Sequence, residues 1–576
     1  MTAQEALKTY WGYDDFRPLQ AEIVESVLAG HDTLALMPTG GGKSLCFQVP
    51  TMVMDGLCLV ITPLIALMKD QVENLRRHNI QAAAIYTGMS YEQQKAALDN
   101  CMWGPYRFLY VSPERLESEE FRERLARLPI CLIAVDEAHC ISQWGYDFRP
   151  SYLKIAEIRE VIRRKAKGDE AMRREVPILA LTATATPEVV DDIQERLAFR
   201  EKNVLRKSFL RSNLSYVVRE TNKKADEIVH ILSRVPGSAI VYVRNRQRAQ
   251  ELATYLQEKG ISADFYHAGL SSKERAAKQE AWKIGEKAMR REGERPGTRV
   301  IVATNAFGMG IDKPDVRVVI HHDLPDTIEA YFQEAGRAGR DEQKAFAVLL
   351  YDPSDKTKAR KRIADNYPDE ETLHNVYHKT CNYLGVGADS GQGATFFIDM
   401  FDLCKKMHLP VFPTYSALHL LSQMGYFSFD EEQEIQPRVR LRVTRRELEE
   451  YQLNEEENSL VEHLMREYTG IFTELQYVHK LDDRHQELVA LAQKRIIDYV
   501  PRTKANVLRL SVNRQSEIRI PQEFYKQRKN HYANKLKAMV EYAENKHFCR
   551  SQVMLAYFGE NDASVCASCD VCRGKR

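Results

Sequence analysis

The stretch Met37-Pro38-Thr39-Gly40-Gly41-Gly42-Lys43-Ser44 joins three adjacent glycines to a lysine and a hydroxyl residue. It follows the apolar run Thr33–Leu36 and precedes Leu45–Val49, which predicts a buried strand, a phosphate loop and the start of a helix. Glycines let backbone N–H groups surround an anion without Cβ clashes, and a helix N-terminus adds partial positive charge. Met37 stands where the general pattern of such loops has its first glycine. The predicted nucleotide-binding residues of this loop are Thr39, Gly40, Gly41, Gly42, Lys43 and Ser44, with Lys43 on the β- and γ-phosphates of the nucleotide and Ser44 on Mg²⁺.

Composition limits the class of protein. The chain has 576 residues, 44% of them hydrophobic and 28% charged, which is ordinary for a soluble protein of about three to five domains. Its net charge is only +1, so any surface for nucleic acid has to be local. Neither a membrane span nor a signal peptide is expected, because the necessary apolar runs are absent from the sequence. Eleven cysteines in a chain of this length predict free thiols in a reducing, cytoplasmic compartment.

Two series of short apolar runs alternate with helical patterns along the first two thirds of the chain. They are Thr33–Met37, Leu57–Thr62, Tyr106–Val111, Ile130–Asp136 and Ile178–Thr182, then Ser238–Val243, Ala263–His267, Arg299–Thr304, Val316–His321 and Phe346–Tyr351. This alternation predicts an α/β fold with two tandem parallel-sheet lobes, 1–207 and 208–355, joined through Ser208–Val218.

Acidic residues follow a strand beside the phosphate loop. Asp136-Glu137-Ala138-His139 comes directly after the apolar run Ile130–Val135. Asp136 is therefore predicted to hold Mg²⁺, and Glu137 to orient and deprotonate an attacking water. Thr182-Ala183-Thr184, after another strand, is a weaker candidate for linking this site to the second lobe.

The second lobe offers two arginines in the segment Gln333-Glu334-Ala335-Gly336-Arg337-Ala338-Gly339-Arg340. Phosphoryl transfer develops negative charge that a guanidinium group stabilises. Arg337 and Arg340 are therefore predicted to serve this role if both lobes line one cleft, so that nucleotide draws the lobes together.

In this order the motifs resemble those of superfamily 2 helicases, and further stretches narrow the likeness. Cys140–Pro150 is similar to the aromatic-rich loop of RecQ helicases, and Tyr266–Leu270 and Phe307–Pro314 also resemble that family. The resemblance implies RecA-like lobes and an ATP- and Mg²⁺-dependent DNA helicase that moves 3′→5′ in recombination and repair.

The resemblance also implies roles for individual residues. Leu7–Gln20 is similar to the family's adenine-binding motif, so Tyr13 and Arg17 are expected to sandwich the base and Gln20 to bond its edge. Aromatic and charged residues alternate in the loop that contains Trp144, which suits stacking on single-stranded bases. The residues expected at DNA are Pro63, Ser112, Arg115, Trp144, Phe148, Arg149, Thr304 and Asn305.

Four cysteines near the end of the sequence form a C-x16-C-x2-C-x2-C pattern. Four thiolates with two tight knuckles suit tetrahedral Zn²⁺, and the surrounding residues again resemble RecQ proteins. The predicted ligands are Cys549, Cys566, Cys569 and Cys572, in a helical zinc-binding module over 523–576 with no catalytic role for the metal.

The order of parts departs from the family's usual one. In RecQ proteins zinc usually follows the second lobe closely, but here 197 positions separate Asp352 from Cys549. The intervening region, 356–522, predicts two successive helix–hairpin modules, either winged helices or small packing modules. In the first module the strands are Tyr426–Phe429 and Arg438–Val443; in the second they are Ile496–Val500 and Val507–Val512. The turn of the second holds Arg502 and Lys504, in a stretch with 14 Lys/Arg and 5 Asp/Glu between 494 and 550 that favours phosphate contacts.

Two other functions fit the sequence less well. An RNA helicase of the same superfamily would share the nucleotide site, and a non-catalytic zinc-stabilised DNA-binding scaffold would not need Asp136, Glu137 and Arg340. The expected partners are single-stranded and forked DNA, and single-strand-binding or repair proteins. The protein is expected in the cytoplasm, at the nucleoid of a bacterium or in the nucleus of a eukaryote.

Overall fold

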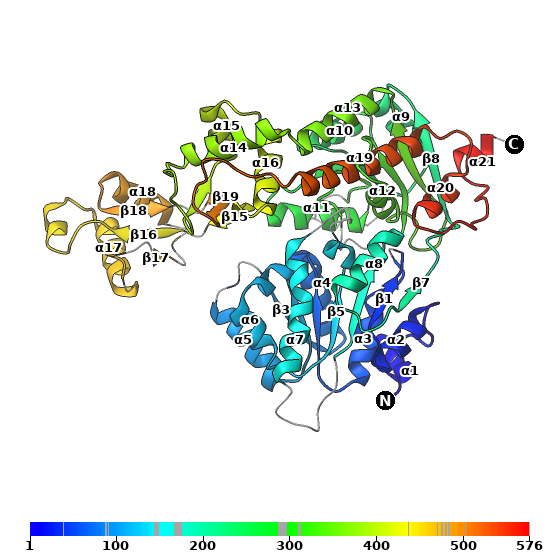
Figure 1. Cartoon of the computed structure of the whole chain (residues 1–576), viewed down its shortest axis with the longest axis horizontal. Helices are drawn as coiled ribbons and strands as arrows, with labels where there is room; N and C mark the ends of the chain where they lie inside the picture. The colour runs from blue at the N-terminus through cyan, green and yellow to red at the C-terminus, as the bar shows by residue number, and fades with distance from the viewer. Residues whose placement is uncertain are drawn as a thin grey trace. The chain divides into compact units, whose positions relative to one another are not determined.

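The computed structural model (Figure 1) describes residues 1–38, 40–86, 89, 91–142, 149–165, 176–285, 297–308, 313–435, 437–468, 470–473, 476–478, 481, 484–500 and 503–574. The chain forms two compact units, one made of Met1–Ala359 with His531–Arg576 and the other of Arg360–Asn530. Among the described residues, no helix combines the length and the apolar character needed to cross a membrane.

The first lobe is a parallel sheet with the strand order β3-β4-β2-β5-β6-β1-β7. Its strands are β1 (Thr33–Leu36), β2 (Leu57–Ile61), β3 (Gln81–Ile85), β4 (Tyr106–Val111), β5 (Ile130–Val135), β6 (Ile178–Thr182) and β7 (Val204–Arg206). Its helices are α1 (Ala3–Ala6), α2 (Gln20–Leu28), α3 (Leu45–Val53), α4 (Ile65–Arg77), α5 (Tyr91–Trp103), α6 (Glu119–Leu125), α7 (Ile155–Lys165) and α8 (Pro187–Arg196). Strands β5, β6 and β1 are neighbours, so the loops after them meet at one edge of the sheet.

The second lobe is also a parallel sheet, with the order β10-β11-β9-β12-β13-β8. Its strands are β8 (Leu214–Glu220), β9 (Ser238–Tyr242), β10 (Ala263–Tyr266), β11 (Val300–Ala303), β12 (Val316–His321) and β13 (Ala345–Tyr351), and its helices are α9 (Lys224–Arg234), α10 (Arg246–Glu258), α11 (Ser272–Ile284) and α12 (Ile328–Ala335). The predicted pair of parallel-sheet lobes is confirmed. Strands β3, β7 and β8 are exceptions, because none of the predicted runs covers them, and edge strand β8 lies where the sequence predicted a plain connection.

The last part of the first unit packs on the second lobe. It comprises the end of α19 (Gln522–Glu544), α20 (Arg550–Tyr557) and α21 (Asp570–Gly574). Tyr542 of α19 contacts Tyr331 of α12 with ring centroids 5.5 Å apart, and Phe558 contacts Phe332 of α12 at 5.1 Å. A buried ion pair joins Lys535 to Glu329 at 2.8 Å. The chain leaves the first unit within α13 (Ser354–Asn366) and returns to it within α19.

The second unit contains a helix–strand–helix–helix–strand–strand order typical of winged-helix domains. The elements are α14 (Glu370–Tyr383), β14 (Thr395–Ile398), α15 (Met400–Met407), α16 (Val411–Gln423), β15 (Phe427–Ile435) and β19 (Thr503–Leu510). The strands form the sheet β14-β19-β15, and Leu373, Leu421, Phe427 and Leu508 share its hydrophobic core.

A second small fold lies between β15 and β19. It consists of β16 (Arg438–Leu441), α17 (Glu455–Glu467), β17 (Gln476–Tyr477), α18 (His485–Gln493) and β18 (Ile497–Val500), with the sheet order β17-β16-β18. Its own core contains Val439, Leu460, Leu464, Leu488 and Ile496. We call residues 437–500 the nested subdomain.

The strand pairing in this unit corrects the predicted one. Two successive hairpins were expected, but β15 pairs with β19, and β16 pairs with β18 (Figure 1). Ile435 is opposite Thr503, and Arg438 is opposite Val500. The two strand pairs therefore follow one another as one long antiparallel ribbon, with β15 and β16 on one side and β18 and β19 on the other. The apolar positions explain this choice, because Phe429 and Leu508 belong to one core, whereas Val439 and Ile497 belong to the other.

Candidate functional site

The phosphate loop follows β1 and depends on its glycines. Gly40 and Gly42 have φ values of +83° and +78°, in the left-handed region that favours glycine. A Cβ at Gly42 would lie 2.3 Å from Nε2 of Gln20, and one at Gly41 would lie 2.9 Å from the Pro38 carbonyl oxygen. Lys43 and Ser44 follow immediately, and α3 begins at Leu45. Thr39 lies outside the described residues.

Two of the predicted adenine-binding side chains contact this loop. Gln20 donates from Nε2 to the Gly42 carbonyl at 2.9 Å, and Arg17 donates from Nη1 to the Gly40 carbonyl at 3.0 Å. The Arg17 backbone N–H in turn donates to Oε1 of Gln20 at 2.9 Å. Tyr13, the third predicted residue, has 53% of its surface exposed, as expected for a ring available to stack on a ligand.

The acidic pair at the end of β5 faces the phosphate loop. Oε1 of Glu137 is 4.0 Å from Nζ of Lys43, and Oε2 of Glu137 is 3.4 Å from Nδ1 of His139. Nδ1 of His139 is also 2.9 Å from the Thr182 hydroxyl, so the ends of β5 and β6 are tied together. Glu137 has φ +48°, an uncommon backbone conformation for a residue with a side chain. The sequence pattern gave His139 no role, and only the sheet order places it between Glu137 and Thr182.

The electrostatics of this edge suit a divalent cation. Desolvation, followed by the adjacent Glu137 carboxylate, raises the pKa of Asp136 above its ordinary value, while Lys43 opposes the rise. A bound cation beside Ser44 and Asp136 would supply the positive charge that this carboxylate lacks. The residues present therefore fit Mg²⁺ held between the phosphate loop and β5.

The predicted arginines of the second lobe lie just after α12. Arg337 is only 4% exposed, and a Cβ at Gly308 would lie 3.7 Å from its Nη2 atom. Arg340 lies alongside the phosphate loop, because a Cβ at Gly40 would be 3.4 Å from Cγ of Arg340. Residues far apart in the sequence, one from each lobe, thus meet at this loop.

Three of the predicted DNA-contact loops in the first lobe converge at Arg149. Its Nη1 donates to the Pro63 carbonyl at 3.4 Å and lies 3.9 Å from Oε1 of Glu114, while its backbone N–H donates to the Cys140 carbonyl at 2.8 Å. Pro63 follows β2, and Glu114 follows β4. The other expected residues of this group are Ser112, which is buried at the end of β4, and Arg115, whose guanidinium carbon lies 5.9 Å from the centre of the Phe121 ring; Trp144 and Phe148 lie outside the described residues.

On the second lobe, Thr304 and Asn305 follow β11. The Thr304 N–H donates to the Tyr266 carbonyl at 3.2 Å, which ties this loop to the end of β10, while Asn305 is exposed. Thr304 itself is buried, so Asn305 is the more accessible of the two to a ligand.

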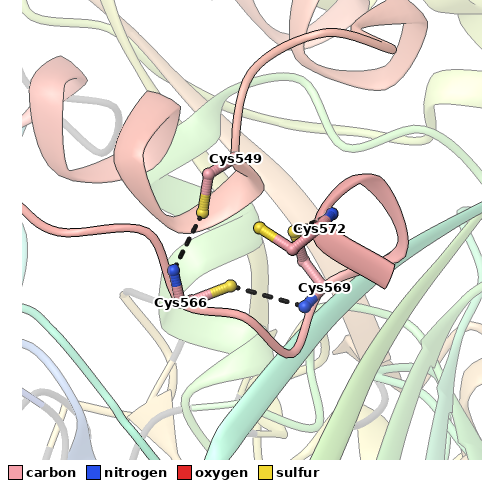
Figure 2. A group of neighbouring side chains, drawn as sticks. All are labelled: Cys549, Cys566, Cys569 and Cys572. Atoms are coloured by element: carbon pink, nitrogen blue, oxygen red, sulfur yellow. Dashed lines mark hydrogen bonds between the residues drawn. The ribbon is translucent and has the colours of Figure 1, made fainter. Parts of the chain in front are cut away.

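The four cysteines of the C-terminal pattern come together, as Figure 2 shows. Their sulfur atoms all lie within 4.8 Å of one another. A tetrahedral zinc with Zn–S bonds of about 2.3 Å needs sulfurs about 3.8 Å apart, so these residues fit Zn²⁺ after small adjustments. The N–H groups of Cys566, Cys569 and Cys572 each donate to a sulfur of the cluster at 3.3–3.4 Å. Beside the cluster, buried Arg550 pairs with Asp570 through two guanidinium nitrogens, which fixes α20 against α21.

Three family models match the chain. A DEAD/DEAH box helicase model matches residues 17–193, a helicase conserved C-terminal domain model matches 223–342, and a RecQ zinc-binding model matches 511–573.

Curated relatives and solved structures resemble the same regions. The ATP-dependent DNA helicase RecQ of Haemophilus influenzae is 41% identical over 355 residues, which are 62% of this chain and 54% of the relative. The probable ATP-dependent DNA helicase RecS of Bacillus subtilis is 40% identical over 357 residues, 61% of this chain and 67% of the relative. The chain spans about half the length of the first RecQ relatives it matches. The crystal structure of the DUF1998 helicase MrfA bound to DNA and AMPPNP shares the fold, with a TM-score of 0.50 and 18% identity over 63% of this chain and 52% of that one. With two parallel-sheet lobes, a four-cysteine cluster and relatives of this similarity, the chain belongs to the RecQ family of helicases.

Proposed function

We propose that this protein is an ATP- and Mg²⁺-dependent DNA helicase that moves 3′→5′ along a single strand and separates duplexes during recombination and repair. The observation that carries the proposal is the meeting of both lobes at one loop. Lys43 and Glu137 of the first lobe lie 4.0 Å apart, and the Arg340 side chain of the second lobe runs beside Gly40. One nucleotide bound here touches both lobes, so its hydrolysis can change how they contact each other.

Each residue of this site then has a chemical role. Lys43 and Ser44 hold the phosphates and the metal, Asp136 positions the metal, and Glu137 orients the attacking water and takes its proton. Bound Mg²⁺ supplies charge neutralisation at the phosphates. Arg337 and Arg340 stabilise the negative charge that develops on the transferred group.

Adenine binding is coupled to the phosphate loop in this proposal. Tyr13 and Arg17 flank the base and Gln20 bonds its edge, while Arg17 and Gln20 also hold the Gly40 and Gly42 carbonyls. A nucleotide that engages these side chains therefore acts on the loop that binds its phosphates. This arrangement favours ATP over nucleotides with another base.

DNA occupancy is coupled to the same site through the loop after β5. Trp144, Phe148 and Arg149 are proposed to contact single-stranded DNA, together with Pro63, Ser112, Arg115, Thr304 and Asn305. Arg149 supports this coupling, since it bonds the Pro63 carbonyl and stands on the chain segment that begins at Glu137. Stacking is worth about 1–3 kcal/mol per base, which is enough to couple DNA occupancy to the catalytic pair.

The remaining parts have supporting roles. Cys549, Cys566, Cys569 and Cys572 hold Zn²⁺ as a structural centre of the module 523–576. The regions 1–207 and 208–355 are the two motor domains, and 356–522 is an insertion. We infer forked DNA and single-strand-binding or repair proteins as partners, and a cytoplasmic location at the nucleoid of a bacterium or the nucleus of a eukaryote.

The test removes the proposed phosphate-binding lysine in one variant and the proposed catalytic base in another. Lys43→Ala and Glu137→Gln are expected to reduce DNA-stimulated ATP turnover by about 10²–10⁴-fold, because the phosphate clamp or the base is lost. Lys202→Ala serves as the control, since the Lys202 side chain is exposed and pairs with exposed Asp191. Phosphate release near the wild-type rate in either variant would reject the assignment.

The same assay decides the nucleic acid. Single-stranded DNA is expected to stimulate ATP turnover more than RNA of the same sequence, and Trp144→Ala is expected to abolish most of the DNA effect while leaving the basal rate intact. Stronger stimulation by RNA would favour an RNA helicase, and no stimulated turnover at all would favour a non-catalytic scaffold. Trp103→Ala is the matched control, because Trp103 is 86% exposed at the end of α5.

A further inference from the structure

The segment that joins the two lobes makes specific bonds to the loop that carries the arginines. We call Gly336–Arg340 the arginine loop. Arg211 donates from Nη2 to the Gly339 carbonyl at 2.7 Å and to the Ala338 carbonyl at 3.1 Å, and from Nη1 to the Gly336 carbonyl at 3.5 Å. One side chain from outside the sheet thus holds three carbonyls of this loop.

Asn213, two residues further on, holds the same loop, and we call Arg211 and Asn213 together the clip. Its Nδ2 donates to the Gly339 carbonyl at 2.7 Å and to the Gln343 carbonyl at 3.0 Å, and its Oδ1 accepts from Nε of Arg211 at 3.3 Å. Gly339 has φ +60°, and a Cβ there would lie 2.6 Å from Nδ2 of Asn213. The close approach of Asn213 therefore requires glycine at this position.

The carbonyls of the arginine loop that Arg211 and Asn213 hold lie on both sides of Arg337 and directly before Arg340 in the sequence. A planar guanidinium has a fixed fork of donors, so it specifies the relative orientation of the peptide groups that it bonds. Fixing the peptide groups at Gly336, Ala338 and Gly339 fixes the directions in which Arg337 and Arg340 leave the backbone. Burial lowers the pKa of Arg211, and the carbonyl dipoles around it compensate for the water that its guanidinium has lost.

The segment is anchored on its other side as well. The Ser208 hydroxyl donates to Oε2 of Glu560 at 2.7 Å, and the Phe209 N–H donates to Oε1 of the same carboxylate at 2.8 Å. Phe209 also contacts Phe332 of α12 and Phe558, with ring centroids 5.7 Å and 5.0 Å away. The segment that carries Arg211 and Asn213 is therefore itself held in place by contacts with α12 and with the residues after α20.

We propose that Arg211 and Asn213 are positioning residues that hold the arginine loop in the orientation in which Arg337 and Arg340 meet the nucleotide. The proposal rests on the function proposed for those two arginines. It assigns to the segment between the lobes an indirect part in catalysis, because the side chains of that segment hold the backbone of the arginine loop.

The first experiment measures ATP turnover and nucleotide binding separately. Arg211→Ala is expected to lower kcat by about 10- to 100-fold, since small misplacements of a catalytic group cost this much, while the Kd for a fluorescent ATP analogue changes less than about twofold. The kcat of Arg211→Lys is expected to lie between those of Arg211→Ala and the wild type, because an ammonium keeps the charge but lacks the fixed planar fork of donors that orients the carbonyls.

Arg299→Ala is the matched control. Arg299 is in the same lobe and donates in the same manner to the carbonyls of Gly237, Leu232 and Val235, but these belong to the end of α9 and the turn before β9. Its kcat is expected to stay near the wild-type value. Equal losses in Arg299→Ala and Arg211→Ala would mean that any such clip is needed for folding, and would overturn the proposal.

A double-mutant cycle separates positioning from a general structural effect. In an Arg337→Ala/Arg340→Ala background, Arg211→Ala is expected to cause no further loss of kcat, because there is no arginine left to position. A further loss of tenfold or more in that background, or an unchanged kcat for Arg211→Ala in the wild type, would overturn the inference. If Arg211→Ala fails to fold, Asn213→Ala replaces it in the same cycle, and the same two results would overturn the inference.

The outcomes also separate this inference from the proposed function. Near-normal turnover in Arg337→Ala/Arg340→Ala would reject the role of the arginines themselves, whatever Arg211 does. Low turnover in that variant with normal turnover in both Arg211→Ala and Asn213→Ala would keep the proposed function and reject only the positioning role.

Discussion

The two lobes share one architecture but assemble their functional groups in different ways. In the first lobe, a chain of direct contacts joins residues at or just after the ends of neighbouring strands, namely Lys43, Glu137, His139 and Thr182. In the second lobe, the arginines stand on a loop after α12 whose backbone is held by Arg211 from outside the sheet. The first lobe thus forms its site from its own strand ends, whereas the second depends on the segment that joins it to its neighbour.

The largest effect expected from this difference concerns the second lobe. Arg340→Ala is expected to lower kcat for ATP by about 10³-fold or more, because an arginine on the developing charge contributes this much to phosphoryl transfer. ATP affinity should change far less, since most of the phosphate contacts are proposed to come from the first lobe. Steady-state phosphate release and equilibrium nucleotide binding measure the two effects.

Arg248→Ala provides the control, because Arg248 has an exposed side chain on α10 that pairs with exposed Glu251 at 3.7 Å. A kcat for Arg340→Ala within tenfold of the wild type would show that the first lobe is sufficient for catalysis, and would remove the contrast between the lobes.

A smaller effect is expected on the stability of the first lobe. Asp32, fully buried before β1, accepts hydrogen bonds from Nη2 of Arg159 and from the backbone N–H groups of Ile178 and Arg200, all at 3.0 Å. Burial alone would raise the pKa of Asp32, but the bonds from Arg200 and Ile178 and the charge of Arg159 lower it below its ordinary value. Asp32→Ala is expected to lower the free energy of unfolding by about 3–5 kcal/mol, because it removes a fully buried carboxylate that accepts bonds from two guanidinium groups and two backbone N–H groups.

The sign of the pH dependence follows from the lowered pKa. The stabilisation from Asp32 is fully present above the carboxyl pKa of the unfolded chain, about 3.9, and is lost as the pH falls through the lower pKa of the folded state. Denaturant titrations between pH 7 and pH 3 should therefore show the difference between wild type and Asp32→Ala shrinking toward acid. Asp191→Ala, which removes an exposed partner of Lys202, should show no such trend. A difference that grows toward acid would contradict the assignment.

The smallest effect is expected outside both lobes. Replacing 436–502 by Asn-Gly removes the nested subdomain, and the two-residue turn suits the register because Ile435 and Thr503 are directly opposite each other. ATP turnover stimulated by single-stranded DNA should change less than about twofold, since no residue of the proposed site lies in this segment. Strand displacement on forked duplexes is measured in parallel. A large loss of turnover would show that the nested subdomain contributes to ATP hydrolysis in addition to the two lobes.

The parts predicted correctly are those whose signal is local in the sequence. Runs of apolar residues such as Ile130–Val135 indicate buried strands, and the spacing of the four cysteines predicts that they lie together. The strand β8 was missed because it is an edge strand whose last residues are exposed and polar, so it lacks the continuous apolar run of a central strand.

The parts that were missed depend on pairings between distant residues. Phe427 and Phe429 indicate a strand with one face on a core, but they do not say whether β16 or β19 is the partner. Arg211 gives no signal in a connecting segment, because its three acceptors are backbone carbonyls that any sequence would provide. The roles assigned to Tyr13, Trp144 and the other site residues stay predictions until the variants are measured.

The nesting of the chain has a consequence for its synthesis. The polypeptide begins one unit, makes a second from Arg360 to Asn530, and returns within α19 to finish the first. On a ribosome, which releases the N-terminal part first, both sheets emerge long before Lys535 can neutralise Glu329 in α12. The ribbon repeats this order on a smaller scale, because β19 is made only after the whole nested subdomain. A nascent chain must therefore keep α12 and β15 from incorrect partners while it waits for segments that are still to be translated.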